Sequence, residues 1–300
     1  MKSDQTTTTN PGRSPLELAW RRFAANRAAL ASGAVLAVVM AACFVTAATT
    51  ESGAAVSKAE EAAVGQPHPW GPSWGHPFGT DTNGRDLLLR TLQGGAVSLV
   101  VGLFAAGISV VIGTFYGAIS GQAGGATDRW MMRVVDTLYG LPYILLVILL
   151  LVYAQQKFWV LFVAIGAVSW LTMARIVRGQ VLRLRQEEYV TAARALGAGP
   201  GRILVRHLLP NLVGPIIVCA TLTVPAAILQ ESFLSFLGLG VSAPQASWGT
   251  LASDAVDAVN PVVNCWWLLF FPCLFLGLTL LCMNFLGDGL RDAFDPKGSG

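Results

Sequence analysis

Long apolar stretches alternate with short polar segments along most of the 300 residues. Six stretches are long enough to cross a bilayer as helices, which takes about 20 mostly apolar residues. They lie near residues 28–50, 96–120, 134–155, 158–175, 212–232 and 265–287. The stretch 232–253 is also uncharged, but glycines and a proline interrupt it, so we interpret it as a re-entrant or surface loop. The pattern predicts an all-α integral membrane protein with six transmembrane helices.

The composition agrees with a membrane protein and excludes two other classes. Apolar residues make up 54% of the chain and charged residues only 12%, whereas soluble domains carry roughly 25% charged residues. Disordered chains are poor in aliphatic residues, so they are excluded as well. A polar segment of about 27 residues precedes the first apolar stretch, which is too long for a cleavable signal peptide. The net charge of +3 says little about partners, and we expect no nucleic acid among them.

The basic residues predict the orientation, because Lys and Arg favour cytoplasmic loops. If the N-terminus is cytoplasmic, only Lys58, Arg85, Arg90 and Lys157 of the 20 Lys and Arg residues fall outside. Both termini are therefore predicted to be cytoplasmic. The resulting segments are a cytoplasmic segment 1–27, a first helix 28–50, an extracytoplasmic loop 51–95, a five-helix core 96–288 with a cytoplasmic loop 178–211 and an extracytoplasmic loop 233–264, and a cytoplasmic tail 289–300.

The cytoplasmic loop 178–211 predicts a short helix–turn–helix. Val190, Ala193 and Leu196 have helical spacing, and the glycines of 197–201 break that helix. Pro200 suits the first turn of a second helix, which we expect Pro210 to end. Small and apolar residues on a surface favour docking on a partner protein. An amphipathic hairpin lying on anionic lipid headgroups is the alternative.

Two runs of this loop, AARALG at 192–197 and RHLLPN at 206–211, resemble the EAA loop of ABC importer permeases. Thr191 stands at the family's glutamate position, and Glu187 and Glu188 lie one turn earlier. The resemblance implies that residues 187–209 couple the chain to a separate ATPase. The residues it assigns to coupling are Glu187, Glu188, Thr191, Ala192, Ala193, Gly197, Arg202 and Pro210.

A second resemblance covers the extracytoplasmic side. The segment 76–86 is similar to the HPFGTDxxGRD motif of dipeptide and oligopeptide permeases, carried by His76, Gly79, Asp81, Gly84, Arg85 and Asp86. Further matches follow in the family's order: RVVD at 133–136, LSFLGLG at 234–240, SWG at 247–249 and LGDGLRD at 286–292. The chain resembles the second of that transporter's two permease subunits.

This resemblance implies a type I ABC importer permease (MetI-like) fold in the cell inner membrane. The implied partners are a homologous second permease, two P-loop ATPases and an extracytoplasmic solute-binding protein. Short peptides are the leading solute, with nickel and glutathione as alternatives. A secondary transporter driven by an ion gradient is the rival of a different class, but such proteins carry buried carboxylates at the midplane. Here the carboxylates at membrane depth lie near predicted helix ends.

The chain has no residues for an ATP site or for catalysis. A P-loop needs a lysine after glycine, and none of the four lysines, Lys2, Lys58, Lys157 and Lys297, follows one. We expect ATP to be used only by partner subunits and this chain to bind no cofactor. With three histidines and no nucleophilic set, we expect a non-catalytic subunit.

Several other polar residues have more than one possible role. Asp136 and Arg133 are three apart, which favours a local ion pair over a place in the solute path. Glu231 either lines that path or caps the loop after its helix, and the sequence leaves both open. His68 and His76 each precede a proline in a rigid connector, so we expect no metal site. A calcium loop starting at Asp81 also fails, because its fifth and twelfth positions are Arg85 and Leu92.

Overall fold

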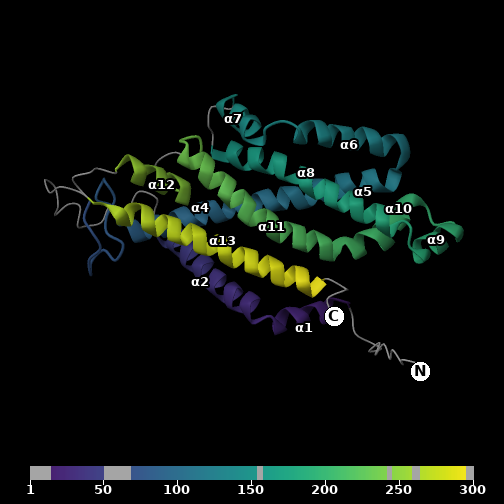
Figure 1. The fold of residues 1–300 in the computed structure, drawn as a ribbon, viewed down its shortest axis with the longest axis horizontal. Helices are drawn as coiled ribbons and strands as arrows, with labels where there is room; N and C mark the ends of the chain where they lie inside the picture. Colours follow the sequence, from purple (N-terminus) through teal and green to yellow (C-terminus); the bar gives the residue numbers. More distant parts are fainter. Residues whose placement is uncertain (1–14, 51–68, 154–157, 242–244, 259–263, 295–300) are drawn as a thin grey trace, which may run out of the picture.

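The computed structural model describes residues 15–50, 69–153, 158–241, 245–258 and 264–294. They form an elongated bundle of helices (Figure 1). The helices are α1 Pro15–Ala25, α2 Arg27–Thr49, α4 Leu87–Ile108, α5 Thr114–Ala123, α6 Gly125–Tyr139, α7 Tyr143–Tyr153, α8 Phe158–Leu184, α9 Glu188–Ala195, α10 Pro200–Ile203, α11 Leu209–Phe236, α12 Trp248–Asp257 and α13 Trp266–Phe294, with wider π-turns η1 Ser109–Gly113 and η2 Leu204–Leu208.

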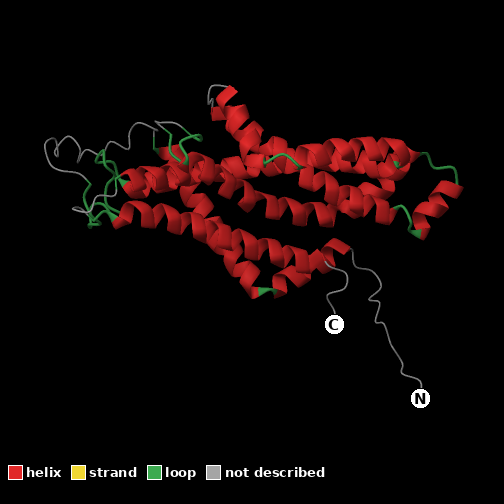
Figure 2. Ribbon diagram, turned by 45° about the horizontal axis from the view of Figure 1, so that its top comes forward, coloured by secondary structure: helices red, strands yellow, loops and turns green. Residues whose placement is uncertain are grey.

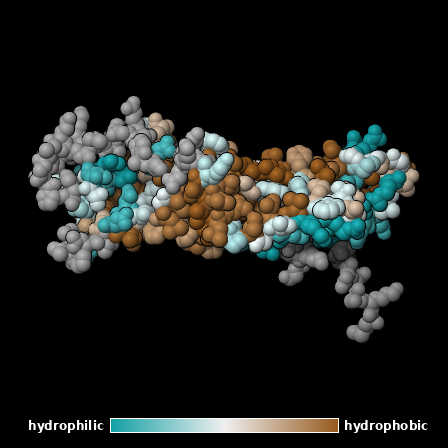
Figure 3. Space-filling model, turned by 90° about the horizontal axis from the view of Figure 1, so that it is seen from above, coloured by the Kyte–Doolittle hydropathy of each residue, from teal (hydrophilic) through white to brown (hydrophobic). Residues whose placement is uncertain are grey.

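Within the described ranges, five continuous helical segments are long and apolar enough to cross a membrane: Arg27–Thr49, Leu87–Ala123, Trp159–Leu184, Pro200–Phe236 and Trp266–Phe294. The pair α6 and α7 passes the same test together but bends by 81°. The predicted count of six is met when this pair is taken as one broken span. The bundle carries an apolar belt along its middle and hydrophilic residues toward both ends (Figure 3).

Three predicted helix limits were wrong. The second span begins at Leu87 rather than near 96, because the Asp86 side chain caps it by accepting the Leu89 N–H at 3.0 Å. The third span is not one straight helix 134–155. It breaks before Pro142, because a proline disfavours helical geometry in the residue preceding it.

The third difference is at Pro210, which does not end a helix. The segment from Pro200 to Phe236 is continuous, and Pro210 lies in the first turn of α11, directly after the π-turn η2. Proline lacks the N–H that a helix interior would use. The π-turn already shifts the hydrogen-bond pattern, with the Leu209 N–H bonding to the Leu204 carbonyl, so the proline is accommodated there.

The two ends of the bundle have different elements. The start of α4, α12 and the start of α13 lie at one end, called here the α12 end (Figure 1). α9, α10 and the last turns of α13 lie at the other, called the α9 end. Figure 2 shows the same separation, with loops gathered at the α12 end. The stretch predicted as a loop at 233–264 contains the ten-residue helix α12, which begins with a capping box at Ser247 and Thr250.

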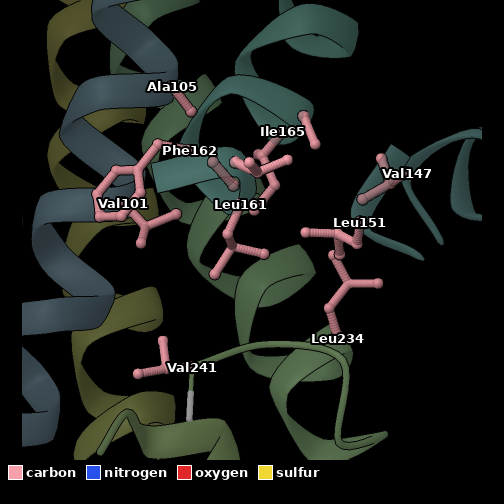
Figure 4. Close-up of a cluster of buried hydrophobic side chains, with 12 residues drawn as sticks. Val101, Ala105, Val147, Leu151, Leu161, Phe162, Ile165, Leu234 and Val241 are labelled. Atoms are coloured by element: carbon pink, nitrogen blue, oxygen red, sulfur yellow. The ribbon is translucent and has the colours of Figure 1, made fainter. Parts of the chain in front are cut away.

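Buried aliphatic side chains and glycines hold the helices together. One cluster joins Val101 of α4, Leu151 of α7, Ile165 of α8 and Leu234 of α11 (Figure 4). Near the α9 end, the glycines of α5 lie directly against α8. A Cβ at Gly117 would clash with the Ala174 carbonyl, so glycine is required for this close approach.

Candidate functional site: the α9 end

The loop predicted to couple to an ATPase forms a small helix on the surface of the α9 end. α9 begins at Glu188, and Gly197 ends it with a φ of 84°. The Ala198 N–H bonds to the Ala193 carbonyl at 3.0 Å, which is the pattern of a glycine-terminated helix. The predicted break at Gly197 is confirmed, because an L side chain is strained at this φ.

A single buried side chain anchors α9. Val190 is fully buried in a cluster with Val181 of α8, Ile203 of α10 and Leu208 of η2. Ile203 and Leu208 come from the second helix predicted in this loop, and both are buried. α9 therefore sits on the junction where α8 ends and the α10–α11 segment begins.

Most other side chains of the loop are exposed on the surface. Leu196 is 88% exposed and Val205 is 65% exposed. Of the residues predicted for coupling, only Ala193 is partly buried, and the others are exposed: Glu187, Glu188, Thr191, Ala192, Gly197, Arg202 and Pro210. Large apolar side chains at such exposure are typical of an interaction surface.

Tyr189 adds a polar group to this surface. Its side chain is 41% exposed, and its hydroxyl accepts a hydrogen bond from Asn211 at 3.4 Å. Partial burial raises the pKa of the Tyr189 phenol, and the nearby Glu187 carboxylate raises it further. The side chain is therefore neutral at physiological pH.

A polar cluster beneath α9 ties three helices together, α5, α6 and α8. Arg178 of α8 donates two hydrogen bonds of 2.6 Å to the Asp128 carboxylate of α6, and Ser120 of α5 donates a third of 2.6 Å. Arg185 donates to the Gly121 carbonyl at 2.6 Å. The sequence did not predict this cluster, because its members come from separate helices. Only Asp128, an acidic residue in the first turn of α6, has a position that sequence spacing could have pointed out.

A groove runs between α8 and α11 and reaches the last turn of α13. Its volume is about 600 Å³. Hydroxyl and amide side chains line it together with aliphatic ones, among them Ser169, Thr172, Gln180, Thr223 and Gln230. At the α9 end it is bounded by Arg291 and Phe294. The lining is therefore largely apolar, with uncharged polar groups among the aliphatic ones and Arg291 as its charged residue.

The motif at residues 76–86 forms a folded turn at the α12 end. Asp81 accepts the N–H groups of Asn83 at 2.9 Å and Arg85 at 2.8 Å, and it pairs with Arg90. His76 Nδ1 lies 2.9 Å from the Asp86 carboxylate. Asp81 therefore caps a turn that leads into α4, and Asp86 caps the helix itself.

The glycines of this motif have the backbone that the turn requires. Gly79 and Gly84 have φ values of 79° and 80°, which only glycine adopts without strain. Among the described residues, no group of three or more metal-ligating side chains comes together. His68, the other histidine of the predicted connector, lies outside the described residues.

The predicted partner of Asp136 was wrong. Asp136 pairs with Arg175 of α8 at 2.7 Å, not with Arg133 on its own helix. Arg175 also lies over the Tyr139 ring, 4.0 Å from its centroid. The pairing is therefore structural, as expected, but it joins two helices instead of two turns of one.

Glu231 does not line the groove. Its side chain is fully buried and accepts hydrogen bonds from Ser98 at 2.7 Å and Ser235 at 2.6 Å. The Ser235 hydroxyl in turn receives the Val241 N–H at 3.4 Å. The sequence left open whether Glu231 lines the solute path or caps the loop after its helix, and this arrangement fits the second role. Glu231 also links α11 to α4.

Comparisons with known proteins give consistent matches along the chain. A family model described as the inner membrane component of binding-protein-dependent transport systems matches residues 109–299. A second model, the N-terminal transmembrane domain of oligopeptide transport permease C, matches residues 14–52.

Individual relatives cover nearly the whole chain. The oligopeptide transport system permease protein OppC of Haemophilus influenzae is 48% identical over 293 residues, covering 95% of this chain and 90% of that protein. The dipeptide transport system permease protein DppC of Bacillus subtilis is 47% identical over 287 residues, covering 96% and 87%. An inward-facing structure of the MetNI methionine ABC transporter aligns with a TM-score of 0.59 at 17% identity, covering 70% of this chain and 98% of that one. This likeness confirms the MetI-like fold.

Proposed function

Because the chain belongs to the family of binding-protein-dependent inner-membrane permeases, we propose that it forms half of the translocation path of an ATP-driven importer of short peptides. The observation that carries this proposal is the surface helix α9, with its exposed Leu196 and its single anchor at Val190. The proposed partners are a second permease, two ATPases and an external solute-binding protein. ATP is hydrolysed by the ATPases, and this subunit takes no catalytic part.

The ATPase docks on residues 187–209 in this proposal. Leu196 and the small residues around it suit a shallow groove, because small side chains let a partner's backbone come close. The same end of the bundle is predicted to be cytoplasmic from its arginines. Docking there places the ATPase where ATP is available.

Movement passes from α9 to the solute path through α11. Val190 packs on Ile203 and Leu208, and the helix from Pro200 to Phe236 has no break. A displacement of α9 therefore moves α10 and α11 together, as a rigid body. Since α11 forms one wall of the α8–α11 groove, closure of the ATPases changes the groove's opening.

The α8–α11 groove is proposed as this subunit's share of the path, with the second permease opposite. Its hydroxyl and amide groups form hydrogen bonds with peptide backbones of any sequence. The absence of acidic side chains from its described lining fits a solute that varies in charge. Selection then rests with the solute-binding protein outside the membrane.

Peptides are preferred over nickel and glutathione for two reasons. The relatives at 48% and 47% identity are named as oligopeptide and dipeptide permeases. In addition, no group of three or more metal-ligating side chains comes together among the described residues, as a nickel site would need.

The solute is tested by uptake in a strain that lacks the gene. Labelled di-, tri- and pentapeptides are compared with nickel ion, and the wild-type gene is returned as a control. We expect peptide uptake to be lost and then restored. Normal peptide uptake together with reduced nickel accumulation would refute the proposed solute.

The coupling role is tested with Gly197→Pro and Ala193→Arg. Proline cannot adopt the φ of 84° at Gly197, and arginine at 193 would fill the small-residue surface. We expect both proteins to insert normally, while ATP hydrolysis no longer drives uptake. Gly238→Pro imposes the same strain at the α12 end, where φ is 75°, and should leave ATPase co-purification unchanged. Normal uptake by both α9 variants would contradict the assignment.

A further inference from the structure

A basic groove separate from the α8–α11 groove lies between α6 and α8. It has a volume of about 710 Å³ and is lined by Arg129 and Arg133 of α6 and Arg175 and Arg178 of α8, with Asp136 as the only acidic side chain in its described lining. The proposed coupling and the proposed solute path use none of these residues. Such a concentration of guanidinium groups requires an explanation, because like charges repel at short range.

Two of the four arginines are neutralised within the chain. Arg178 pairs with Asp128 through two hydrogen bonds, and Arg175 pairs with Asp136. Neither Arg129 nor Arg133 has a carboxylate partner in the part of the chain that the structure describes. The groove therefore keeps two guanidinium groups, on successive turns of one helix face, available for an anion.

The surface beside these arginines is apolar. Trp130 is 70% exposed and Val134 is 49% exposed on α6, one position along from Arg129 and Arg133. The opposite face of the helix is buried through Met132 and Val135. α6 lies along the edge of the bundle, next to α8 (Figure 1). An exposed tryptophan beside arginines is typical of a position at the membrane interface.

From this arrangement we propose that the α6–α8 groove binds the phosphate headgroup of an anionic phospholipid. Arg129 and Arg133 hold the phosphate, since guanidinium groups bind phosphate oxygens in pairs. The acyl chains lie along Trp130 and Val134. Basic pockets between helices on the cytoplasmic side are suited to such headgroups, so the inference rests on the orientation in the proposed function.

Lipid binding in this groove would stabilise residues next to the proposed coupling region. Arg178 lines this groove and also bonds to Asp128, which in turn bonds to Ser120. These residues form the polar cluster beneath α9. A bound phosphate therefore stabilises the α5–α6–α8 junction against which the α9 region moves.

The test measures retained lipid on the assembled transporter. The complex is reconstituted in nanodiscs containing equal parts phosphatidylglycerol and phosphatidylcholine, extracted into detergent, and its bound lipid is counted by native mass spectrometry. We expect the wild type to retain phosphatidylglycerol selectively. The variant Arg129→Gln/Arg133→Gln should weaken that binding roughly 5-fold for each arginine removed. Equal retention by the wild type and this variant overturns the proposal.

Two further variants separate lipid binding from charge and from folding. Arg21→Gln/Arg183→Gln removes the same charge from exposed positions outside the groove and should retain lipid like the wild type. Arg129→Lys/Arg133→Lys keeps the charge and should retain more lipid than the glutamine variant. Equal loss in the Arg21/Arg183 control would show a general surface effect and overturn the proposal.

The other occupants are distinguished in the same experiment. If inorganic phosphate stabilises the lipid-free complex against heat, and the glutamine variant removes this effect, then the groove binds a soluble anion and the lipid proposal fails. If the glutamine variant loses the second permease instead of lipid, an acidic side chain of that partner fills the groove and the proposal also fails. Neither result depends on solute uptake, so the proposed function is tested independently.

Discussion

At the α12 end, the motif at 76–86 pairs its charged side chains within the subunit, whereas at the α9 end the loop at 187–209 presents a large apolar side chain on its surface. Asp81 with Arg90 and His76 with Asp86 are pairs whose side chains are 14% exposed or less. By contrast, Leu196 at the α9 end is 88% exposed. Both ends carry motifs that resemble the same transporter family, so a shared resemblance does not imply a shared kind of role.

Under the proposed function, this difference separates residues that build the subunit from residues that recognise partners. The motif at 76–86 shapes one turn and caps α4, and its polar atoms are used within the chain. The loop at 187–209 buries Val190, Ile203 and Leu208 but leaves much of its remaining surface exposed, including Leu196. A buried polar network stabilises a fixed geometry, while an exposed apolar side chain gains energy only when a partner covers it.

The largest expected effect on ATPase binding is at Leu196. Leu196→Asp places a charge where the ATPase is proposed to dock, and losing a central contact costs about 2 kcal/mol or more, roughly 30-fold in affinity. We expect the variant to insert normally but to co-purify with far less ATPase.

Its matched control is Val256→Asp on α12, where the native side chain is 46% exposed. The control should leave ATPase binding unchanged. If both variants lost the ATPase equally, the contrast between the two ends would be wrong.

The largest expected effect on stability is at the α12 end. Arg90→Gln leaves the Asp81 carboxylate, whose side chain is 6% exposed, without its charged partner. Removing one member of a buried pair costs about 3–5 kcal/mol, so the thermal midpoint of the purified subunit should fall by several degrees.

ATPase co-purification distinguishes a loss of stability from a loss of partner binding. We expect folded Arg90→Gln to bind the ATPase as the wild type does. Arg85→Gln is the control on the same turn, since Arg85 bonds to Asp81 through its backbone N–H. An unchanged midpoint in Arg90→Gln would contradict the structural role of the pair.

The apolar pattern of the sequence predicts the helices well, because burial in lipid needs long uninterrupted stretches. The break at Gly197 is also predictable, since its cause is local. Pro210 was mispredicted, because a proline's effect depends on the turn before it, and the π-turn η2 has no sequence pattern that announces it.

Contacts between helices could not be predicted from spacing. Asp136 bonds to a residue 39 positions away, and Glu231 bonds to Ser98, 133 positions away. Sequence spacing identifies partners three or four residues apart on one helix, so a nearby arginine was preferred for Asp136. Serines carry no charge, so nothing in the sequence indicated the hydroxyl groups around Glu231.

The smallest effect concerns those hydroxyl groups and tests whether the α12 end depends on them. Ser98 is fully buried, donates to Glu231 at 2.7 Å and receives the Trp248 N–H at 3.4 Å. Ser98→Ala removes both bonds without adding bulk, and an unsatisfied buried group costs about 1–3 kcal/mol. We expect a midpoint lower than that of the wild type but higher than that of Arg90→Gln. Thr49→Ala, which loses an exposed bond within α2, should shift stability by less than about 0.5 kcal/mol. If Ser98→Ala and Thr49→Ala had the same thermal midpoint, apolar packing alone would hold α11 and α4 together. The buried hydrogen bonds would then not distinguish the α12 end from the α9 end in stability.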